Sequence, residues 1–179
     1  HHVRSNCGVF DVSHMGEFIV SGNNAKTFLQ NVTTNDINNL EAGKVQYSAF
    51  CNDSGGVIDD LLVYHLGDYY MLVVNASNIE KNFEWLSSKL IDDVSLEDQS
   101  DTISLLALQG PLSRVYLKKL YPKIEKLKYY ETLLPDNDKV VVARTGYSGE
   151  LGFEIYAPNS IILKLWNEIL SLSDDVLPV

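Results

Sequence analysis

The chain has 179 residues, of which 45% are hydrophobic and 21% are charged, and its formal net charge is -10. This composition is typical of a folded globular protein, and the length suits one large domain or two packed units. The acidic balance, with 24 Asp and Glu against 14 Lys and Arg, argues against a nucleic acid partner, because phosphate backbones are bound by clustered cations.

Cysteine usage and hydropathy exclude further classes of protein. Cys7 and Cys51 are too few for a disulfide framework, and neither has a second ligand at metal-binding spacing. No apolar stretch approaches the ~18 residues of a membrane span, and no charged segment followed by an apolar one forms a leader. We therefore expect no metal, no membrane partner, and a soluble location in the cytoplasm, or in the mitochondrial matrix if the source is a eukaryote.

Strand and helix signals alternate through the N-terminal part of the chain. Residues 18–20 end a strand, and a short helix with one apolar face follows. Three strands joined by turns rich in Gly, Asn and Asp come next, at 44–51, 57–66 and 69–75. Ser77 and Glu80 have the spacing of a capping box and predict the start of a helix that ends near Asp92.

The C-terminal part of the chain repeats this plan. A buried strand at 103–108 is followed by a helix with Pro111 at its first position, which runs to about Tyr121. Two paired strands then flank a Gly-rich loop, at 140–144 and 153–156. A closing helix with an apolar face begins at Pro158.

These signals predict an α+β fold of two ferredoxin-like units, each an antiparallel sheet with helices on one side. One unit is inserted in the other or packed on it. We assign residues 19–99 to the inserted unit and residues 1–18 and 100–179 to the other unit. The charged stretch 92–101 is the expected seam between the two.

Alternation along 57–66 places two adjacent carboxylates on opposite faces of one strand. Asp60 shares a face with Leu62 and Tyr64, and Asp59 lies on the other face. A carboxylate beside apolar neighbours has a raised pKa unless it finds partners, and general acids and bases are often tuned in this way. The alternative is that one of the two ends a turn or accepts hydrogen bonds from backbone N–H groups.

The Gly-rich segment 145–154 is the second candidate for function. Its glycines recur every third residue, but the spacing and the strand that follows argue against a dinucleotide-binding loop. A hairpin that exposes Tyr147 and aims Glu154 is one interpretation, and a plain turn with an exposed Tyr is the other. Ser13 and His14 are adjacent on an extended chain and therefore cannot meet as nucleophile and base.

Six segments carry recognisable motifs in order along the chain. Three of them are Gly-Val-Phe-Asp-Val-Ser-His-Met-Gly at 8–16, Gly-Gly-Val-Ile-Asp-Asp-Leu-Leu-Val-Tyr at 55–64, and Arg-Thr-Gly-Tyr-Ser-Gly-Glu-Leu-Gly-Phe-Glu at 144–154. The other three are Gly-Lys-Val-Gln-Tyr at 43–47, Val-Val-Asn-Ala at 73–76 and Ala-Leu-Gln-Gly-Pro at 107–111. Together they closely resemble the aminomethyltransferase, or T-protein, family of the glycine cleavage system.

The resemblance implies an enzyme that takes the aminomethyl group from the lipoyl arm of a partner H-protein and passes its carbon to tetrahydrofolate. Methylenetetrahydrofolate and ammonia are the products. By this likeness Asp60 is the catalytic carboxylate near the folate nitrogens that receive the carbon, and Glu154 holds the pterin edge. The likeness assigns the other folate-slot positions to Met15, Tyr47, Leu62, Tyr64, Asn75, Tyr129, Tyr130 and Tyr147.

Two alternatives share the implied fold and pterin slot. One is a folate-dependent, demethylase-type relative that takes its carbon from another donor, and the other is a non-catalytic folate-binding module. The resemblance also implies a further β-rich domain beyond Val179, which this chain lacks and which carries arginines that help to hold folate. Without it, the chain alone could bind folate weakly and catalyse nothing.

Overall fold

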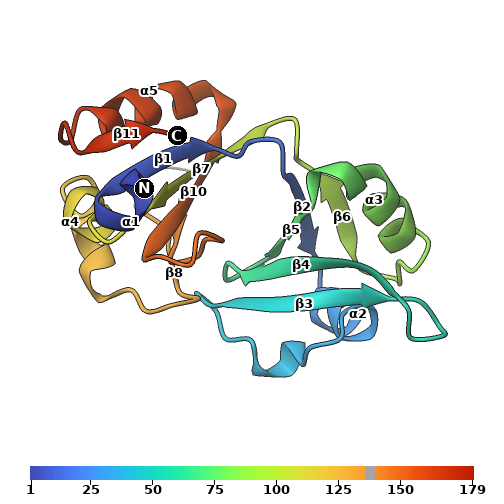
Figure 1. Cartoon of the computed structure of the whole chain (residues 1–179). Helices are drawn as coiled ribbons and strands as arrows, with labels where there is room; N and C mark the ends of the chain where they lie inside the picture. The colour runs from blue at the N-terminus through green and yellow to red at the C-terminus, as the bar shows by residue number, and fades with distance from the viewer. Residues whose placement is uncertain (136–139) are drawn as a thin grey trace. The chain divides into compact units, whose positions relative to one another are not determined.

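The computed structural model describes residues 1–135 and 140–179, which form two compact units (Figure 1). The discontinuous unit comprises residues 1–13 and 102–179, and the inserted unit comprises residues 14–101. In chain order the inserted unit therefore interrupts the discontinuous one. Each unit contains one sheet and its own helices, so the predicted α+β class is confirmed.

The inserted unit is built on an antiparallel sheet with the strand order β3-β4-β5-β2-β6. Its strands are β2 (Gly16–Ser21), β3 (Val45–Cys51), β4 (Val57–His65), β5 (Tyr70–Val74) and β6 (Ser95–Asp98). The predicted meander is confirmed as β3-β4-β5. Its two turns use Gly55 and Gly67 at φ values of 83° and 93°, a conformation that L side chains rarely adopt.

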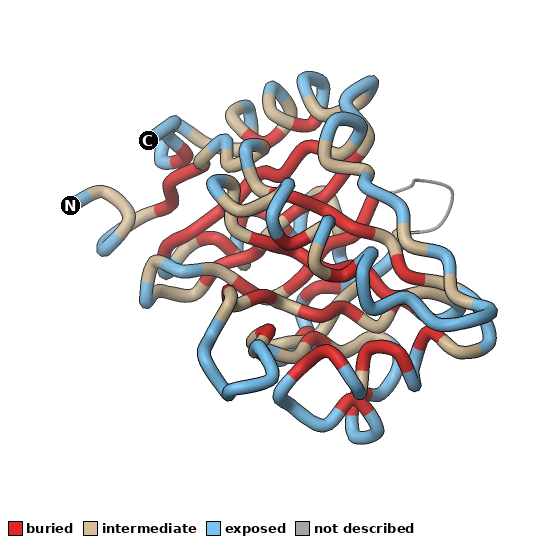
Figure 2. The backbone as a smooth tube through the Cα atoms, turned by 90° about the vertical axis from the view of Figure 1, so that its right-hand side faces the viewer, coloured by how far each residue is buried: buried red, intermediate tan, exposed pale blue. Residues whose placement is uncertain are grey.

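The helices of the inserted unit share a hydrophobic core with its sheet. They are α2 (Ala25–Val32) and α3 (Ile79–Ser87), with the short 3-10 helices η1 (Ile37–Asn39) and η2 (Ala76–Asn78). Leu61 and Val63 of β4 contribute to this core together with Phe28 of α2 and Leu86 of α3. Figure 2 shows the buried strands in red and the exposed connections in pale blue. The core therefore takes the face of β4 that Asp59 shares with Leu61 and Val63.

Helix α3 differs from its prediction at both ends. Ser77 lies in η2, and the residue at the N-cap is Asn78, which makes no side-chain capping bond, so the predicted capping box is wrong. The helix also ends at Ser87 and not near Asp92. The hydroxyl of Ser87 donates to a carbonyl of the last turn, a local bond that competes with continuation of the helix.

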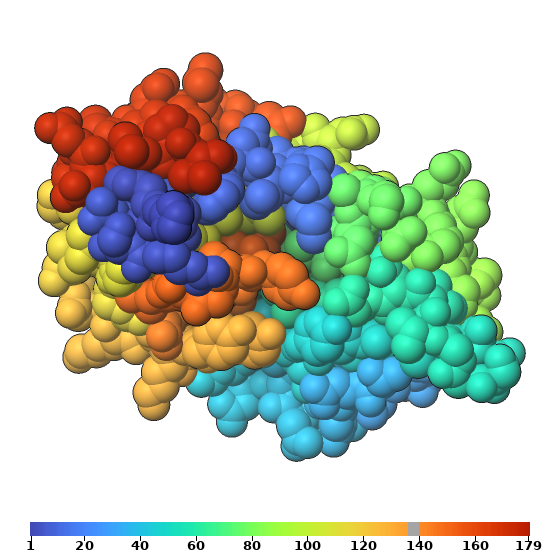
Figure 3. Space-filling model, in the orientation of Figure 1, coloured from blue at the N-terminus to red at the C-terminus, as the bar shows by residue number. Residues whose placement is uncertain are grey.

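The discontinuous unit has a sheet of mixed direction. Within residues 1–135 and 140–179 its strand order is β11-β1-β7-β10-β9-β8, and its one parallel pair is β1-β11. The strands are β1 (Cys7–Asp11), β7 (Ile103–Gln109), β8 (Thr132–Leu133), β9 (Val141–Ala143), β10 (Gly152–Pro158) and β11 (Val176–Pro178). The parallel pair brings the two chain ends side by side, blue against red in Figure 3.

The helices of this unit are α1 (His2–Ser5), α4 (Ser113–Leu117), η3 (Pro122–Lys126) and α5 (Asn159–Leu170). The closing helix predicted from Pro158 is confirmed as α5, which buries Leu165 and Ile169. The predicted helix from Pro111 to about Tyr121 is shorter than expected. After α4 the backbone N–H of Lys119 bonds to the carbonyl three residues earlier, which tightens the last turn before η3 begins.

The part of the chain that the structure describes contains no helix long and apolar enough to cross a membrane. The same residues hold no group of three or more His, Cys, Asp or Glu side chains that could bind a metal ion. Cys7 and Cys51 are both free thiols. Burial raises the pKa of the Cys7 thiol to about 12, so this cysteine is a packed core residue and not a nucleophile.

Glu17 on β2 is an unexpected buried carboxyl. Its side chain is fully buried, and neither carboxylate oxygen has a hydrogen-bond partner among the described residues. Desolvation, and after it the charge of Asp98, raise the Glu17 pKa from 4.5 to about 8. The folded chain therefore holds this proton more tightly than the unfolded chain does.

We expect this carboxyl to make the stability of the fold pH-dependent. A raised pKa in the folded state contributes stability that is fully present below pH 4.5 and is lost as the pH rises to about 8. Glu17→Gln, which resembles the protonated acid, should remove this loss, on the order of a few kcal/mol. The measurement is the urea unfolding midpoint at pH 5, 7 and 9. The exposed Glu97→Gln is the control, and an equal pH dependence in Glu17→Gln and the native chain would contradict the expectation.

Candidate functional site

The two adjacent carboxylates of β4 lie in different surroundings. Asp59 is 8% exposed and accepts a hydrogen bond from the Asn82 Nδ2 of α3 at 2.6 Å. Asp60 accepts at Oδ2 from the hydroxyl of Tyr47 on β3, at 2.8 Å. The prediction that alternation separates the two is confirmed, since Asp59 faces the helices and Asp60 faces the aromatic side of the sheet.

Asn75, the residue after β5, links the two carboxylates. Its Nδ2 donates to Asp60 Oδ1 at 2.8 Å and to Asp59 Oδ1 at 2.9 Å. Both oxygens of Asp60 are therefore oriented by neutral donors, one an amide and one a phenol. Neutral donors hold a carboxylate in place without cancelling its charge, which is the arrangement that a general base or an electrostatic catalyst needs.

Asp59 does not have the raised pKa that its apolar neighbours led us to consider. Burial alone would raise the pKa of this carboxyl, but hydrogen bonds from Asn82, Asn75 and Asn78 and from a backbone N–H outweigh burial and hold the pKa below its usual range. Asp59 is therefore ionised in the folded chain. Its partners were missed from the sequence, although a polar Asn82 among the apolar residues of α3 was an available signal.

Strand register collects further predicted site residues around Asp60. Leu62 pairs with Tyr47 on β3, and Tyr64 pairs with Val45, so these side chains share the Asp60 face. Tyr47 is half exposed whereas Tyr64 is fully buried. Met15 lies directly before β2 and is partly buried. The inserted unit thus carries Tyr47, Asp60, Leu62, Tyr64 and Asn75 on adjacent strands.

The Gly-rich loop between β9 and β10 is built around the buried side chain of Gln109. The Gln109 Nε2 donates to the carbonyl oxygens of Thr145 and Phe153, each at 3.3 Å, and its Oε1 accepts from the Ser148 hydroxyl at 2.7 Å. A Cβ at Gly146 or Gly152 would collide with the Gln109 amide. A side chain at either position would therefore displace the Gln109 amide from its hydrogen bonds, and Gly146 also has a φ of 146°, which L side chains rarely adopt.

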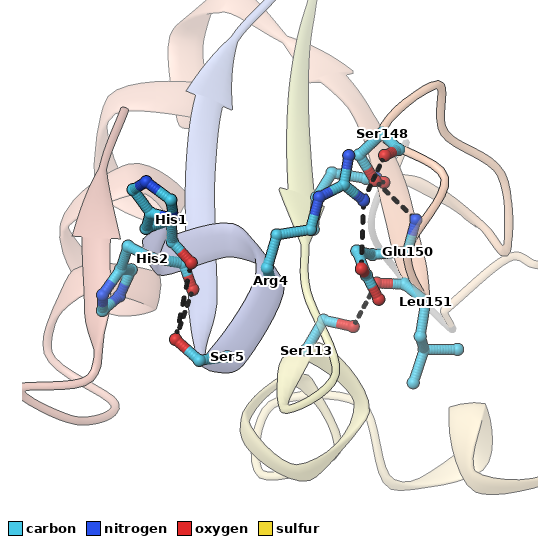
Figure 4. Close-up of polar contacts among 9 residues, drawn as sticks. His1, His2, Arg4, Ser5, Ser113, Ser148, Glu150 and Leu151 are labelled. Atoms are coloured by element: carbon cyan, nitrogen blue, oxygen red, sulfur yellow. Dashed lines mark hydrogen bonds and ion pairs between the residues drawn. The ribbon is translucent and has the colours of Figure 1, made fainter.

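Side chains of α1 and α4 also form hydrogen bonds with the Gly-rich loop (Figure 4). Arg4 of α1 donates to the carbonyl of Ser148 at 2.8 Å and pairs with Glu150 at 3.0 Å. The hydroxyl of Ser113 donates to the carbonyl of Leu151 at 3.1 Å. Tyr147 is fully exposed in this loop, as the hairpin interpretation and the plain-turn alternative both predicted.

Glu154 lies on β10 directly after the loop. Its Oε2 accepts from the Thr145 hydroxyl at 2.5 Å and from the Tyr156 hydroxyl at 3.3 Å. Its cross-strand neighbours are Ala107 on β7 and Ala143 on β9. Both cross-strand neighbours are therefore small residues. Thr145, which the sequence analysis did not single out, orients this group.

Tyr129 and Tyr130 form a stacked aromatic pair before β8. Their ring centroids are 4.3 Å apart with an interplanar angle of 17°, and Tyr129 is 59% exposed. Tyr130 has a φ of 62°, a strained conformation for a bulky residue, and its N–H bonds to the carbonyl of Arg144 next to the Gly-rich loop. The pair offers a flat surface to an aromatic ligand.

Comparisons with known proteins agree with one another. A family model described as GCVT N-terminal domain matches residues 1–176. Aminomethyltransferases from Chloroherpeton thalassium and a Geobacillus species are 49% identical over 173 residues and 47% identical over 183 residues. These alignments cover 94% and 98% of this chain but 48% and 50% of the relatives. The chain spans about half the length of the curated relatives it matches.

Solved structures give the same result. The glycine cleavage system aminomethyltransferase T from Bartonella henselae is 32% identical, with a TM-score of 0.92 over 99% of this chain and 49% of that protein. A heterotetrameric sarcosine oxidase from Corynebacterium sp. U-96 is 18% identical, with a TM-score of 0.66 over 93% of this chain and 83% of that chain, which shows a shared fold alone. The resemblance drawn from the six segments is confirmed, and the chain belongs to the GCVT N-terminal domain family.

Proposed function

We propose that this chain is the folate-binding and transfer part of an aminomethyltransferase of the glycine cleavage system. It would pass the aminomethyl carbon from the lipoyl arm of an H-protein to tetrahydrofolate, giving methylenetetrahydrofolate and ammonia. The observation that carries the proposal is the Asp60 carboxylate, held at both oxygens by Tyr47 and Asn75 in a chain whose relatives are named aminomethyltransferases.

The proposed role of Asp60 follows from the bonds that change. The transferred carbon gains bonds to two folate nitrogens and loses its bonds to the lipoyl sulfur and to the amine. Two protons leave the folate nitrogens, and the thiol and ammonia each take up one. Asp60 orients and polarises the nitrogen that receives the carbon, because a fixed carboxylate stabilises the positive charge that develops there.

Glu154 has the complementary role of binding the pterin. A carboxylate accepts two parallel N–H bonds from a guanidine-like edge, and the two alanines beside Glu154 are compatible with such a partner. The remaining slot positions supply walls for flat rings and for the arm of the ligand. We assign these walls to Met15, Tyr47, Leu62, Tyr64, Asn75, Tyr129, Tyr130 and Tyr147.

The setting of the enzyme is part of the same proposal. We infer a cytoplasmic protein that works with lipoylated H-protein and needs no metal. The additional length of the relatives would supply the β-rich domain expected from the resemblance. Its arginines would supply cations for the anionic tail of folate, of which this acidic chain has few.

Ammonia release decides between this reaction and its rivals. The chain, and the longest native polypeptide that contains it, are mixed with aminomethylated H-protein and tetrahydrofolate, and ammonia is measured over time. Release that requires both substrates supports the proposal. Tight folate binding without ammonia would favour a demethylase-type relative, and binding of neither substrate would reject the proposal.

Asp60→Asn should separate binding from chemistry. The amide has the shape of the carboxylate but no charge, so we expect the affinity for tetrahydrofolate to change by less than about threefold while kcat falls roughly 100-fold or more. Calorimetry and the ammonia assay measure the two quantities. Asp68→Asn in the exposed turn before β5 is the matched control. Full turnover in Asp60→Asn would remove the assigned role.

Glu154→Gln should weaken the binding of tetrahydrofolate, whereas Asp60→Asn should mainly lower kcat. Loss of the charge weakens both hydrogen bonds to the pterin edge, so the Kd for tetrahydrofolate should rise about 10- to 100-fold. The variant is titrated by calorimetry beside Glu168→Gln, a glutamate of α5 that pairs with a lysine on the helix surface. An unchanged Kd in Glu154→Gln would show that this carboxylate does not hold the pterin.

A further inference from the structure

We propose that Asp59 is a positioning residue, which acts through Asn75 to hold Asp60 in its reactive orientation and is itself anchored by Asn82. The inference rests on the proposed function, because it concerns the carboxylate assigned to the transfer. It adds Asp59 and Asn82, two buried residues that lie behind Asn75 and Asp60. These residues lie entirely within the inserted unit.

The shared amide is the first step of the argument. One nitrogen, Asn75 Nδ2, donates to Asp59 Oδ1 at 2.9 Å and to Asp60 Oδ1 at 2.8 Å. An amide nitrogen carries two hydrogens, and this geometry uses one for each carboxylate. Rotation of the amide toward either partner would weaken the other bond. The position of Asp59 therefore determines how Asn75 presents its second N–H to Asp60.

The charge of Asp59 makes the orientation of Asn75 unique. An ionised carboxylate only accepts hydrogen bonds, so Asn75 must turn its NH₂ group, and not its oxygen, toward Asp59. The hydrogen bonds that lower the Asp59 pKa keep it in this form. A neutral group at the same place could also donate, and Asn75 could then turn its oxygen toward Asp60.

Asn82 fixes the far oxygen of Asp59. Its Nδ2 donates to Asp59 Oδ2 at 2.6 Å, and its side chain is fully buried on α3. Asn78, one helical turn earlier, also hydrogen bonds to this carboxylate. Asn78 at the N-cap of α3 and Asn82 within the helix are four residues apart, a spacing that places them on one side of the helix.

The buried hydrogen-bond network of Asp59, Asn75 and Asn82 is not explained by a gain in folding stability. Asn82 Oδ1 is buried and has no hydrogen-bond partner among the described residues. A buried charged network of this kind usually adds little net stability over apolar residues of the same volume, and an orphan acceptor reduces it further. Buried polar atoms without a hydrogen-bond partner are uncommon in proteins and concentrate at functional sites, where the geometry of the site is selected over stability.

The central test is Asp59→Asn, together with the exchanged pair Asp59→Asn/Asn82→Asp. The single variant should lower kcat about 10- to 100-fold while the KM for tetrahydrofolate stays nearly constant, as is usual when a supporting group is lost. In the exchanged pair the new Asp at 82 accepts from the new Asn at 59, whose oxygen then faces Asn75. Turnover should recover in the pair. Asp68→Asn is again the control.

A readout without substrate tests the positioning directly. In the native chain the two side-chain N–H signals of Asn75 in an ¹⁵N NMR spectrum should show hydrogen bonding to carboxylates, with slow solvent exchange. Asp59→Asn should shift both signals and accelerate exchange, and the exchanged pair should restore them. Unchanged Asn75 signals in Asp59→Asn would overturn the proposal, whether or not the protein shows transferase activity.

The kinetic results separate the two proposals. No ammonia release by the native protein would reject the proposed function, and the NMR signals of Asn75 would still decide the role of Asp59. Native turnover with an unchanged kcat in folded Asp59→Asn would reject the positioning role alone. Loss of unfolding stability in Asp59→Asn without a kinetic effect would assign the network to folding and would also overturn the inference.

Discussion

The bond between Asn75 and the two adjacent carboxylates of β4 is the constraint on which the candidate site depends. Pleating sends Asp59 and Asp60 to opposite faces of the sheet, so a single donor can reach both only from the end of the neighbouring strand. β5 ends at Val74, and Asn75 follows in that position. The core face of β4 and the face that carries Asp60 are thereby joined through one amide.

A similar logic holds in the discontinuous unit, where a buried amide organises an exposed loop. The Gln109 side chain bonds to the carbonyls of Thr145 and Phe153 and to the hydroxyl of Ser148 in the Gly-rich segment. The glycines follow from this arrangement because the loop backbone must pass close to the Gln109 side chain. The same loop delivers Thr145 to Glu154, so the carboxylate proposed to bind the pterin is oriented by the loop that precedes it.

Individual strands and helices show which parts of the fold can be predicted from local sequence patterns. The meander β3-β4-β5, the hairpin β9-β10 and helix α5 were all predicted, because each depends on alternation, turn residues or an apolar stripe within one stretch of chain. The capping box before α3 was wrong, and α4 is shorter than predicted. At the start of α4 a distant segment also contributes, because Leu112 donates its N–H to the carbonyl of Asn6.

The sequence by itself determined the family, the fold class and the opposite facing of Asp59 and Asp60, since motifs and strand periodicity are local properties of the chain. Only the tertiary structure decided which partners each carboxylate finds. Asn82 reaches Asp59 across 23 residues of sequence, and Gln109 reaches Ser148 across 39. These distant contacts also decide the protonation of the buried carboxyls. Asp59 accepts hydrogen bonds from several donors and stays ionised. Glu17 is buried without a hydrogen-bond partner among the described residues, and its pKa is raised to about 8.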